Sequence, residues 1–326
     1  MHSARASLPG GVGRRGRGRG GRSARNYPPS RTPNWASPFP APAAFSARGW
    51  HARPREADVL RRVGRSAAVK QDERDPFVRA LEQARVSAYP HGEYVEQESF
   101  MRRSEILALA REAGVAPGID VLDLCCGIAG PGRFITAQLG CSYLGVDLSS
   151  SAVDIARRRA RDLPCRFEVA RIPPIPSGSF DVVLLFETML AFPEKDALLR
   201  AVANALTAGG RFAFTIEAGP RLTELERSRM PDADTVWLTP LPEIIECLRR
   251  VGLVVRWQDD YSRSHQGIAD SLIEAFAADA ASIVAEIGDR ALAELLDAHR
   301  LWSDWLRRGR VRKLAFVTEK TATPRR

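Results

Sequence analysis

The segment Val121-Leu122-Asp123-Leu124-Cys125-Cys126-Gly127-Ile128-Ala129-Gly130-Pro131-Gly132 joins an apolar run to a cluster of small residues. An apolar run of this length predicts a buried strand, and the small residues that follow predict a tight turn into a helix. A strand, a glycine turn and a helix N-terminus together let the backbone approach a ligand closely at the carboxyl edge of a sheet. We therefore expect a ligand site directly after Leu124.

Short apolar runs and helical patterns alternate on both sides of this segment. The runs that we interpret as strands are 119–124, 143–146, 166–169, 180–186 and 211–216. Alternating units of this kind predict a parallel sheet covered by helices on both faces, which is a doubly wound α/β fold.

Helical patterns also flank these units. Apolar residues recur at helical spacing from Phe77 to Leu81 and from Phe100 to Ala110, with a turn-rich linker at 89–94 between them. Two further apolar runs, 253–257 and 311–317, bracket a segment of about fifty residues with helical patterns at 268–287 and 291–306. That segment is too long for a plain connection, so we expect residues 265–309 to form a helical lid insertion over a substrate.

Charge is concentrated at the N-terminus. Residues 1–75 hold 16 Lys and Arg against 5 Asp and Glu, a net charge of +11, while the whole chain is +9, so the remainder is −2. The tract is rich in Arg, Gly and Pro, which predicts a disordered basic tail over 1–75 and one folded domain over 76–326. The tail is either inert, or the product of an upstream start codon, or a segment that holds single-stranded RNA.

The sequence also bears on the cellular location of the protein and on its cysteines. The sequence has no run of about 18 apolar residues and no signal-peptide block at its start, so we expect a cytoplasmic protein without membrane contact. The five cysteines form no CxxC pair, and we expect no metal site and no disulfide framework.

A second carboxylate supports a nucleoside site. Asp147 follows Asp123 by twenty-four residues and ends the second predicted strand, in Gly145-Val146-Asp147. A carboxylate at that edge can accept hydrogen bonds from both hydroxyls of a ribose.

At this point the chain resembles the class I S-adenosylmethionine-dependent methyltransferases. The resemblance covers about residues 90–320 and includes Ser179-Phe180-Asp181-Val182-Val183, Leu206-Thr207-Ala208-Gly209-Gly210-Arg211-Phe212, and the last strand opening at Gly309-Arg310-Val311-Arg312. It implies a Rossmann-like, doubly wound, seven-stranded sheet, mostly parallel with a closing antiparallel strand, and S-adenosyl-L-methionine as cofactor. By this resemblance Gly127 and Gly130 lie against the methionine part of the cofactor, Asp123 helps to place its amino group, and Asp147 holds the ribose. A helix-capping or loop-bracing role for Asp123 is the alternative.

Two departures from the family pattern concern the same cofactor. Cys125 and Ala129 stand where the family usually has glycine, and Ala170-Arg171-Ile172 stands where many relatives have an acidic residue that binds the adenine amino group. We expect adenine recognition to use the backbone near Ile172. A nicotinamide-dependent oxidoreductase is the rival for this fold, but the glycine spacing is not G-x-G-x-x-G.

Catalytic and substrate-binding candidates come from the same sheet edge. Methyl transfer mainly requires alignment and exclusion of water, and a hydroxyl nucleophile also needs a base. His265, after the sixth strand and before the expected lid, is the candidate base, with a solvated or capping histidine as the alternative. Glu187 ends the fourth strand, where it can meet a cationic or hydroxylated substrate or cap the following turn. The remaining substrate-binding candidates are a carboxylate and aromatic residues suited to an amine, namely Glu217, Tyr94, Trp237 and Tyr261, with Trp302 nearby and core packing as the alternative for each ring.

The layout is similar to small-molecule methyltransferases that act on glycine derivatives, phosphoethanolamine or natural products. We therefore expect methyl transfer to a nitrogen or oxygen of a small-molecule acceptor. Phe186-Glu187-Thr188-Met189 is not the Asn/Asp-Pro-Pro-aromatic motif of amino-directed nucleic-acid methyltransferases, and the double glutamate of protein-arginine methyltransferases is only loosely imitated by Glu187 and Glu194. The alternative from another class is a non-catalytic RNA-binding protein that uses the RGG-like tail on a degenerate methyltransferase fold. Apart from the tail we expect no nucleic-acid partner, and the sequence does not predict the oligomeric state.

Overall fold

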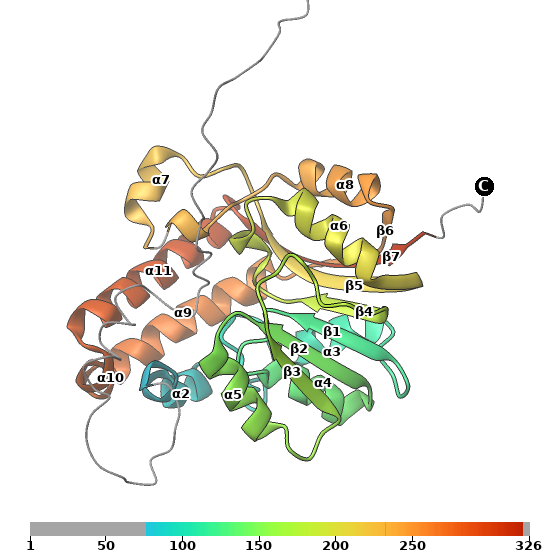
Figure 1. Ribbon diagram of the computed structural model, residues 1–326. Helices are drawn as coiled ribbons and strands as arrows, with labels where there is room; N and C mark the ends of the chain where they lie inside the picture. The colour runs from blue at the N-terminus through green and yellow to red at the C-terminus, as the bar shows by residue number, and fades with distance from the viewer. Residues whose placement is uncertain (1–75, 232, 322–326) are drawn as a thin grey trace, which may run out of the picture. The chain divides into compact units, whose positions relative to one another are not determined.

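A seven-stranded sheet forms the centre of the computed structural model, which describes residues 76–231 and 233–321 (Figure 1). The strands are β1 (Asp120–Leu124), β2 (Ser142–Asp147), β3 (Cys165–Val169), β4 (Phe180–Leu185), β5 (Leu206–Ala218), β6 (Leu253–Asp260) and β7 (Arg312–Lys320). Their order is β3-β2-β1-β4-β5-β7-β6. Strands β1 to β5 pair in parallel, and β7 runs antiparallel to both β5 and β6. The predicted fold class and all seven predicted strands are confirmed.

Helices cover both faces of this sheet. On one face α6 (Lys195–Ala205) and α8 (Leu241–Arg250) bury Leu198, Val202 and Ile244 against strand residues such as Leu122. On the other face α3 (Arg103–Glu112), α4 (Gly130–Leu139) and α5 (Ser150–Arg159) pack against strand residues such as Val121. Because both faces are covered, strands read as continuous apolar runs, and a polar side chain inside one needs a buried partner.

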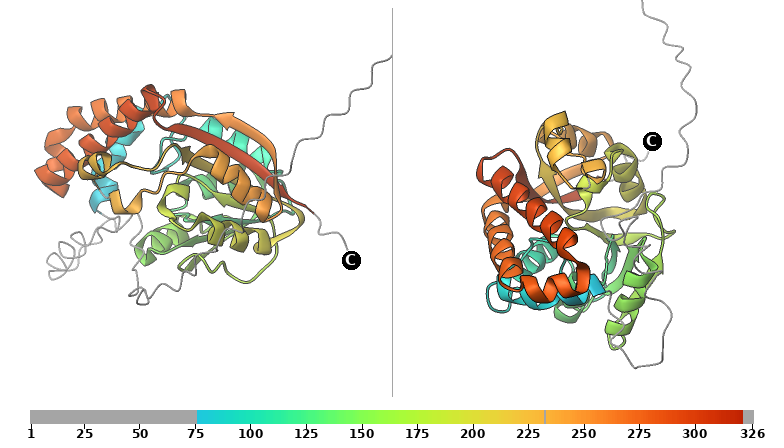
Figure 2. Two further views of the ribbon diagram at one scale, coloured as in Figure 1. Left: turned by 90° about the horizontal axis from the view of Figure 1, so that it is seen from above. Right: turned by 90° about the vertical axis from the view of Figure 1, so that its left-hand side faces the viewer.

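A further layer of helices lies beyond the carboxyl ends of the parallel strands (Figures 1 and 2). It consists of α2 (Pro76–Ala88), α9 (Ser262–Ala278), α10 (Ala280–Ile287) and α11 (Asp289–Arg307), which share a core around Leu81, Leu272 and Phe276. The interpretation of this layer as a lid stays a prediction, as do the domain boundaries, and the expected tail over 1–75 lies outside the described residues.

Three helix boundaries differ from the sequence prediction. The helix expected at 268–287 is broken at Asp279, whose φ and ψ of −101° and 20° end α9 and open α10. Helix α9 also begins earlier, at Ser262, because Ser262 and Asp260 form a local turn that satisfies the backbone there. Helix α3 begins at Arg103, so Met101 precedes it and is nevertheless buried.

Short elements complete the chain between the strands. They are η1 (Met189–Ala191) after β4, and α7 (Glu224–Arg229) and η2 (Ala233–Thr235) between β5 and α8. Within the described ranges, none of the helices combines the length and the apolar character needed to cross a membrane.

Candidate functional site

The loop after β1 has an unusual backbone. Cys125, Gly127 and Ala129 all lie in the left-handed region, with φ of 60°, 54° and 59°. This conformation favours glycine, so Cys125 and Ala129 each hold it at a cost of about 1 kcal/mol or more. A Cβ added to Gly127 would meet no atom within 4 Å, so the space in front of Gly127 is open to a ligand.

Asp147 connects the end of β2 to this loop. Its Oδ2 accepts a hydrogen bond from the Gly127 N–H at 2.9 Å, and its Oδ1 accepts one from the Ser149 N–H at 2.8 Å. Each carboxylate oxygen keeps a second lone pair, so a ribose hydroxyl could still be bound. Leu148, which the sequence analysis missed, leaves an apolar side chain 41% exposed beside this carboxylate. The sequence did contain a signal for Leu148, namely an apolar residue directly after the acidic residue that ends a strand.

Asp123 is a buried carboxyl group on the face covered by α4. Its Oδ2 accepts a hydrogen bond of 2.5 Å from the Tyr143 hydroxyl. Burial, together with the nearby Asp147, raises the pKa of Asp123 to about 7 despite this hydrogen bond. The bracing contact is therefore present, and a direct contact with the cofactor amino group stays a prediction.

Gly130 faces the chain itself. A Cβ there would collide with the carbonyl oxygen of Val95 and the backbone of Glu96. The Glu96 carboxylate in turn pairs with Arg133 at 2.7 Å and with Arg159 at 2.6 Å. The Val95–Glu96 segment thus covers Gly130, so Gly130 does not face an open space as Gly127 does. The contact of Gly130 with a cofactor stays a prediction.

Ile172 lies shortly after β3. The Ala170 N–H donates to the Asp147 carbonyl oxygen at 2.9 Å, which brings this segment beside β2. The Ile172 side chain packs against the core on the face of α6 and α8. Adenine binding near Ile172 stays a prediction.

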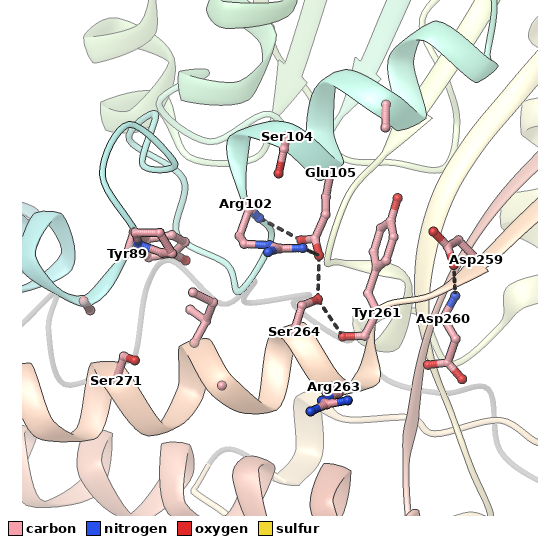
Figure 3. A pocket seen from close by; sticks show the side chains of 15 residues that line it. Tyr89, Arg102, Ser104, Glu105, Asp259, Asp260, Tyr261, Arg263, Ser264 and Ser271 are labelled. Carbon is pink, nitrogen blue, oxygen red and sulfur yellow. Dashed lines mark hydrogen bonds and ion pairs between the residues drawn. The ribbon is translucent and has the colours of Figure 1, made fainter.

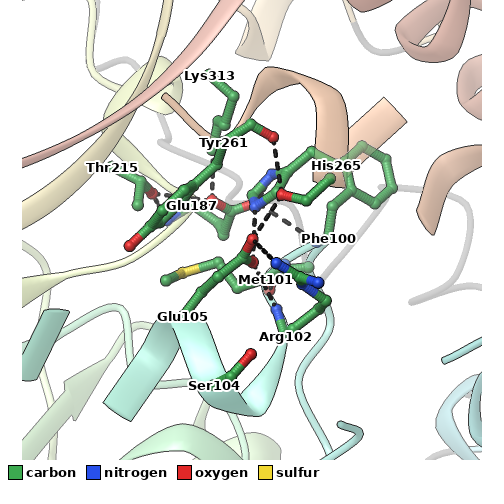
Figure 4. A network of polar contacts seen from close by, with 12 residues as sticks. Phe100, Met101, Arg102, Ser104, Glu105, Glu187, Thr215, Tyr261, His265 and Lys313 are labelled. Atoms are coloured by element: carbon green, nitrogen blue, oxygen red, sulfur yellow. Dashed lines mark hydrogen bonds and ion pairs between the residues drawn. The ribbon is translucent and has the colours of Figure 1, made fainter. Parts of the chain in front are cut away.

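Glu187 lies at the same sheet edge and belongs to a buried polar network (Figure 4). Its backbone has a φ of 60° and its N–H donates to the Thr215 hydroxyl oxygen at 2.7 Å, while that hydroxyl donates to Glu187 Oε1 at 2.9 Å. Lys313 Nζ also contacts Oε1 at 2.6 Å. The carboxylate is thereby fixed from two strands, β5 and β7.

Lys313 connects Glu187 to Glu217. In the β5–β7 register Lys313 stands directly opposite Glu217, and its Nζ donates to Glu217 Oε1. Burial lowers the pKa of Lys313, but the two carboxylates outweigh burial and raise it. Burial raises the pKa of Glu217, and Lys313 opposes that shift only in part. This arrangement holds Lys313 as a cation.

His265 lies in the first turns of α9 and is completely buried. His265 follows the sixth strand, as expected, but it lies inside a helix, because α9 starts at Ser262. His265 Nε2 lies 3.4 Å from Glu105 Oε2, and Nδ1 lies 3.8 Å from Glu187 Oε2. Among the described residues neither ring nitrogen has a hydrogen-bond partner of good geometry.

The two carboxyl groups around His265 are ionised. Burial alone would raise the pKa of Glu187, but Lys313 and His265 outweigh it and lower the pKa. Burial acts in the same direction on Glu105, where hydrogen bonds and the charge of His265 outweigh it and lower the pKa to about 2. Both groups are therefore anions at neutral pH.

The other predicted aromatic residues divide into two groups. Tyr261 is buried and stacks on His265, with ring centroids 5.7 Å apart at 27°. Tyr94 makes its ring contact with Tyr89, and burial raises its pKa to about 12. Trp237 is 37% exposed under the Arg227 guanidinium, and Trp302 packs on Trp305. The structure thus brings Tyr261 to the Glu187 network, whereas Tyr94 and Trp237 have their ring contacts elsewhere.

Sequence reasoning missed Glu105, Thr215 and Lys313. Glu105 is the third residue of α3, and its Oε2 accepts from the Arg102 N–H at 2.9 Å, so it reads as an ordinary helix-capping glutamate. Lys313 directly precedes the apolar run Leu314-Ala315-Phe316-Val317, and a lysine buried in such a strand required a partner. That was a signal the sequence did contain.

Glu105 also lines an open groove of about 910 Å³ between α3 and the start of α9 (Figure 3). Tyr89, Arg102, Asp260 and Ser264 contribute to its walls. Glu105 therefore lines this groove with Arg102 and Ser264, and its Oε2 also lies 3.4 Å from His265 Nε2. The described residues contain no group of three or more His, Cys, Asp or Glu arranged to hold a metal ion.

Comparison with known proteins places this site in a family. A methyltransferase domain model matches residues 121–210, which run from β1 to the start of β5. Residues 121–210 are thus similar to a methyltransferase domain, in agreement with the resemblance to the class I S-adenosylmethionine-dependent methyltransferases. Binding of S-adenosylmethionine, the cofactor of that class, at the loop after β1 stays a prediction.

Relatives of known sequence support the same assignment. Methyltransferase GfsG of Streptomyces halstedii is 32% identical over 106 residues, which is 31% of this chain and 38% of GfsG. The 27-O-demethylrifamycin SV methyltransferase of Amycolatopsis mediterranei is 28% identical over 203 residues, 58% of this chain and 75% of that protein. The match thus spans well under half of GfsG.

A solved methyltransferase structure shares the fold. The phosphoethanolamine N-methyltransferase 2 of Haemonchus contortus, in complex with phosphomonomethylethanolamine and S-adenosylhomocysteine, superposes with a TM-score of 0.64 at 19% identity. The superposition covers 75% of this chain and 57% of that one.

Proposed function

We propose that this protein transfers the methyl group of S-adenosylmethionine to a nitrogen or oxygen atom of a small-molecule acceptor. The observation that carries the proposal is the open left-handed loop at Gly127, held by the Asp147 carboxylate at the carboxyl edge of the sheet. The acceptor class is supported by the names of relatives, which include a rifamycin and a phosphoethanolamine methyltransferase.

The chain's residues fit the cofactor in three respects. The Asp147 carboxylate retains lone pairs for the ribose hydroxyls, the Gly127 Cα leaves room for close approach, and the exposed Leu148 offers an apolar face for a ring. Bound S-adenosylmethionine supplies a methyl group on a sulfonium, which is electrophilic without further activation.

The protein's task is then to orient the acceptor and to exclude water. Glu187 is the group best placed for the acceptor, because it is ionised and lies at the end of β4, next to β1 in the sheet. Its carboxylate can accept a hydrogen bond from an acceptor N–H or O–H, or attract an ammonium group. Glu217 and Tyr261 lie behind it, since Lys313 and His265 stand between them and Glu187.

Calorimetric titration of the full chain with S-adenosylmethionine and S-adenosylhomocysteine tests the cofactor site. We expect binding of both ligands, and we expect Asp147→Ala to weaken it by about 1–3 kcal/mol, the scale of losing charge-assisted hydrogen bonds. Asp154→Ala is the matched control, because Asp154 lies on the following helix with its side chain 58% exposed. A folded, unsubstituted chain that binds neither ligand contradicts the proposal.

The acceptor is identified by a second measurement. Formation of S-adenosylhomocysteine is followed while amines, phospho-amines and hydroxylated natural products are supplied one class at a time. We expect turnover with one of these classes and none with single-stranded RNA. Methylation of RNA instead of any small molecule would overturn the acceptor assignment.

A further inference from the structure

The segment that connects α2 to α3 contacts both halves of the proposed site. Its backbone at Val95–Glu96 lies so close to Gly130 that a Cβ on Gly130 would collide with it. Further along, the Phe100 N–H donates to Glu187 Oε2 at 3.4 Å (Figure 4). Gly130 follows β1 and Glu187 follows β4, and these two strands are neighbours in the sheet. The connecting segment, residues 93–101, therefore runs across the carboxyl edge from the cofactor loop to the carboxylate proposed to meet the acceptor.

The connecting segment also lies beside the space proposed for the cofactor. A hydrogen bond of 2.9 Å from the Ala129 N–H to the Cys126 carbonyl oxygen closes a turn after β1. Gly127 lies inside this turn and has open space in front of its Cα, whereas Gly130 directly follows the turn and is covered by the segment. A ligand that approaches Gly127 is therefore bordered by the segment on the side that leads into α4.

A buried side chain gives the connecting segment a fixed shape. Gln97 is 2% exposed, and its amide nitrogen donates to the Glu93 carbonyl oxygen at 3.1 Å and to the Met101 carbonyl oxygen at 2.7 Å. Its amide oxygen accepts a hydrogen bond from the Val95 N–H. These three bonds join the two ends of the segment to its middle, so its shape is set internally. Its place at the sheet edge then depends on the contacts that it makes with other elements.

Glu96 provides the contact with the helices on the cofactor side. Its Oε2 accepts a hydrogen bond from Arg133 of α4 at 2.7 Å and from Arg159 of α5 at 2.6 Å. The three side chains are between 18% and 32% exposed, so water reaches both ion pairs. Partly exposed pairs of this kind can break without leaving an unpaired charge in the interior. The contact is thus specific and can also open.

The backbone of Glu96 is strained at this point. Its φ of 61° lies in the left-handed region, which favours glycine. A residue with a side chain keeps this conformation where the surrounding contacts fix it. The contacts here are the close approach to Gly130 and the two ion pairs, so Glu96 is held by its backbone and by its carboxylate at once.

We propose that Glu96 is a positioning residue for the bound cofactor: its ion pairs with Arg133 and Arg159 hold the connecting segment as a wall beside the cofactor, and this wall slows the release of S-adenosylhomocysteine. The inference rests on the proposed function, under which the cofactor binds at the loop after β1. A segment that closes beside bound reactants also keeps water away from the transferred methyl group.

Surface plasmon resonance on the immobilised full chain measures the release of S-adenosylhomocysteine. We expect Glu96→Ala to raise the dissociation rate constant at least threefold, because the wall opens more often without its ion pairs. Glu246→Ala is the matched control, since Glu246 also pairs with two arginines, Arg249 and Arg250, but on α8. An increase below threefold in a folded Glu96→Ala chain overturns the inference.

The two arginines test whether the ion pairs carry this effect. We expect the double variant Arg133→Ala and Arg159→Ala to raise the dissociation rate constant as Glu96→Ala does. Adding Glu96→Ala to the double variant should change the rate constant by less than twofold, because residues of one network are not additive. Full additivity would mean that Glu96 acts without the arginines and would exclude the ion pairs as the cause.

Hydrogen–deuterium exchange of the unsubstituted full chain tests the wall without any variant. We expect the backbone amides of residues 93–101 to exchange at least threefold more slowly with saturating S-adenosylhomocysteine, since the wall stays closed while the ligand is bound. The amides of α8 serve as the reference, because that helix covers the other face of the sheet. Exchange in 93–101 that the ligand does not slow, in a chain that binds it, overturns the inference.

Failure of the inference can be told apart from failure of the proposed function. An unsubstituted chain that is folded and binds no S-adenosylhomocysteine refutes the proposed function, and the wall with it. A chain that binds the ligand, but releases it equally fast with and without Glu96, refutes the wall alone.

Discussion

At the scale of single residues, Lys313 is the group on which the polar network depends. It is 2% exposed and contacts both Glu187 and Glu217, so removal of its charge leaves two buried carboxyl groups without the cation that they share. We expect Lys313→Met to lower the free energy of unfolding by about 3–5 kcal/mol, measured by chemical denaturation. Arg312→Met is the control: this neighbour pairs with Asp260 at the surface, where a pair contributes about 0–1 kcal/mol.

The effect of Lys313→Met should depend on Glu217. Adding Glu217→Gln removes one of the two carboxylates, so we expect the double variant to recover part of the lost stability. An additive double variant would show that the two side chains do not interact, because contacting residues deviate from additivity by about 0.5–3 kcal/mol.

Asp123 gives a pH dependence whose sign can be worked out. Its pKa in the folded chain is about 7 against 3.8 for the free side chain, so the folded state holds a proton that the unfolded chain has released between these values. Stability therefore falls as pH rises through this window and is constant above it, and the fall amounts to about 1.4 kcal/mol for each pH unit that separates the two pKa values. We expect Asp123→Asn to remove this fall, so that the variant gains on the unsubstituted chain from pH 4 to pH 7.

Unfolding by urea at several pH values measures the Asp123 effect. Asp120→Asn is the matched control, since Asp120 opens the same strand with its side chain exposed. A constant difference between Asp123→Asn and the unsubstituted chain from pH 4 to pH 8 would mean that Asp123 keeps an ordinary pKa.

The residues of the site were predictable where local sequence specifies them. Asp123 and Asp147 lie at the ends of β1 and β2 and Gly127 follows β1, so the strand pattern alone places them at one edge of the sheet. The charged partners of Glu187 were not predictable in this way, because Lys313 is 126 positions further along the chain and its pairing depends on the β5–β7 register. His265 was singled out, but its burial between Glu105 and Glu187 is a tertiary contact that no local pattern encodes.

At the scale of elements, periodicity placed the strands well and the helix ends less well. Apolar runs that are buried on both faces have clear limits, as in β1 and β4. Helix ends depend on side chains that compete for backbone groups, such as Asp260 before α9, whose Oδ1 accepts from the Ser262 N–H. The short helix α7 has no buried residue, so it had no apolar pattern to detect.

The junction of β1 and α4 depends on two glycines for different reasons. A Cβ at Gly132 would collide with the Tyr143 hydroxyl, which binds Asp123, whereas a Cβ at Gly127 would meet nothing. We expect Gly132→Ala to destabilise the chain by about 1–3 kcal/mol through overpacking, and Gly127→Ala to cost about 1 kcal/mol through backbone strain. S-adenosylhomocysteine binding should show the reverse order, with Gly127→Ala the more damaging.

A second substitution checks the cause of the Gly132 effect. Tyr143→Leu removes the hydroxyl oxygen and the ring carbons Cζ and Cε2 that a new Cβ would strike, so Gly132→Ala should cost less in that background than alone. An equal cost in both backgrounds, by thermal or chemical unfolding, would assign the loss to the helix backbone and not to Tyr143.

At the scale of the whole molecule, charge divides along the chain. Residues 1–75 carry +11, and the remainder, which contains the cofactor loop, carries −2. The affinity for a ligand held by hydrogen bonds to Asp147 and the loop backbone depends little on salt concentration. The affinity for a nucleic acid held by many arginines falls steeply as the salt concentration rises. Salt therefore separates the methyltransferase function from the RNA-binding alternative.

We expect the affinity of the full chain for S-adenosylhomocysteine to change by less than about threefold between 50 mM and 500 mM NaCl, because no net charge is neutralised on binding. Any binding of a single-stranded RNA probe, followed by fluorescence anisotropy, should disappear over the same range. It should also be lost when Arg14, Arg15, Arg17 and Arg19 are replaced by serine, while cofactor binding is unchanged. RNA binding that persists in the serine variant would show that residues other than these four arginines hold the RNA, and binding that persists at 500 mM NaCl would contradict a purely electrostatic contact with the tail.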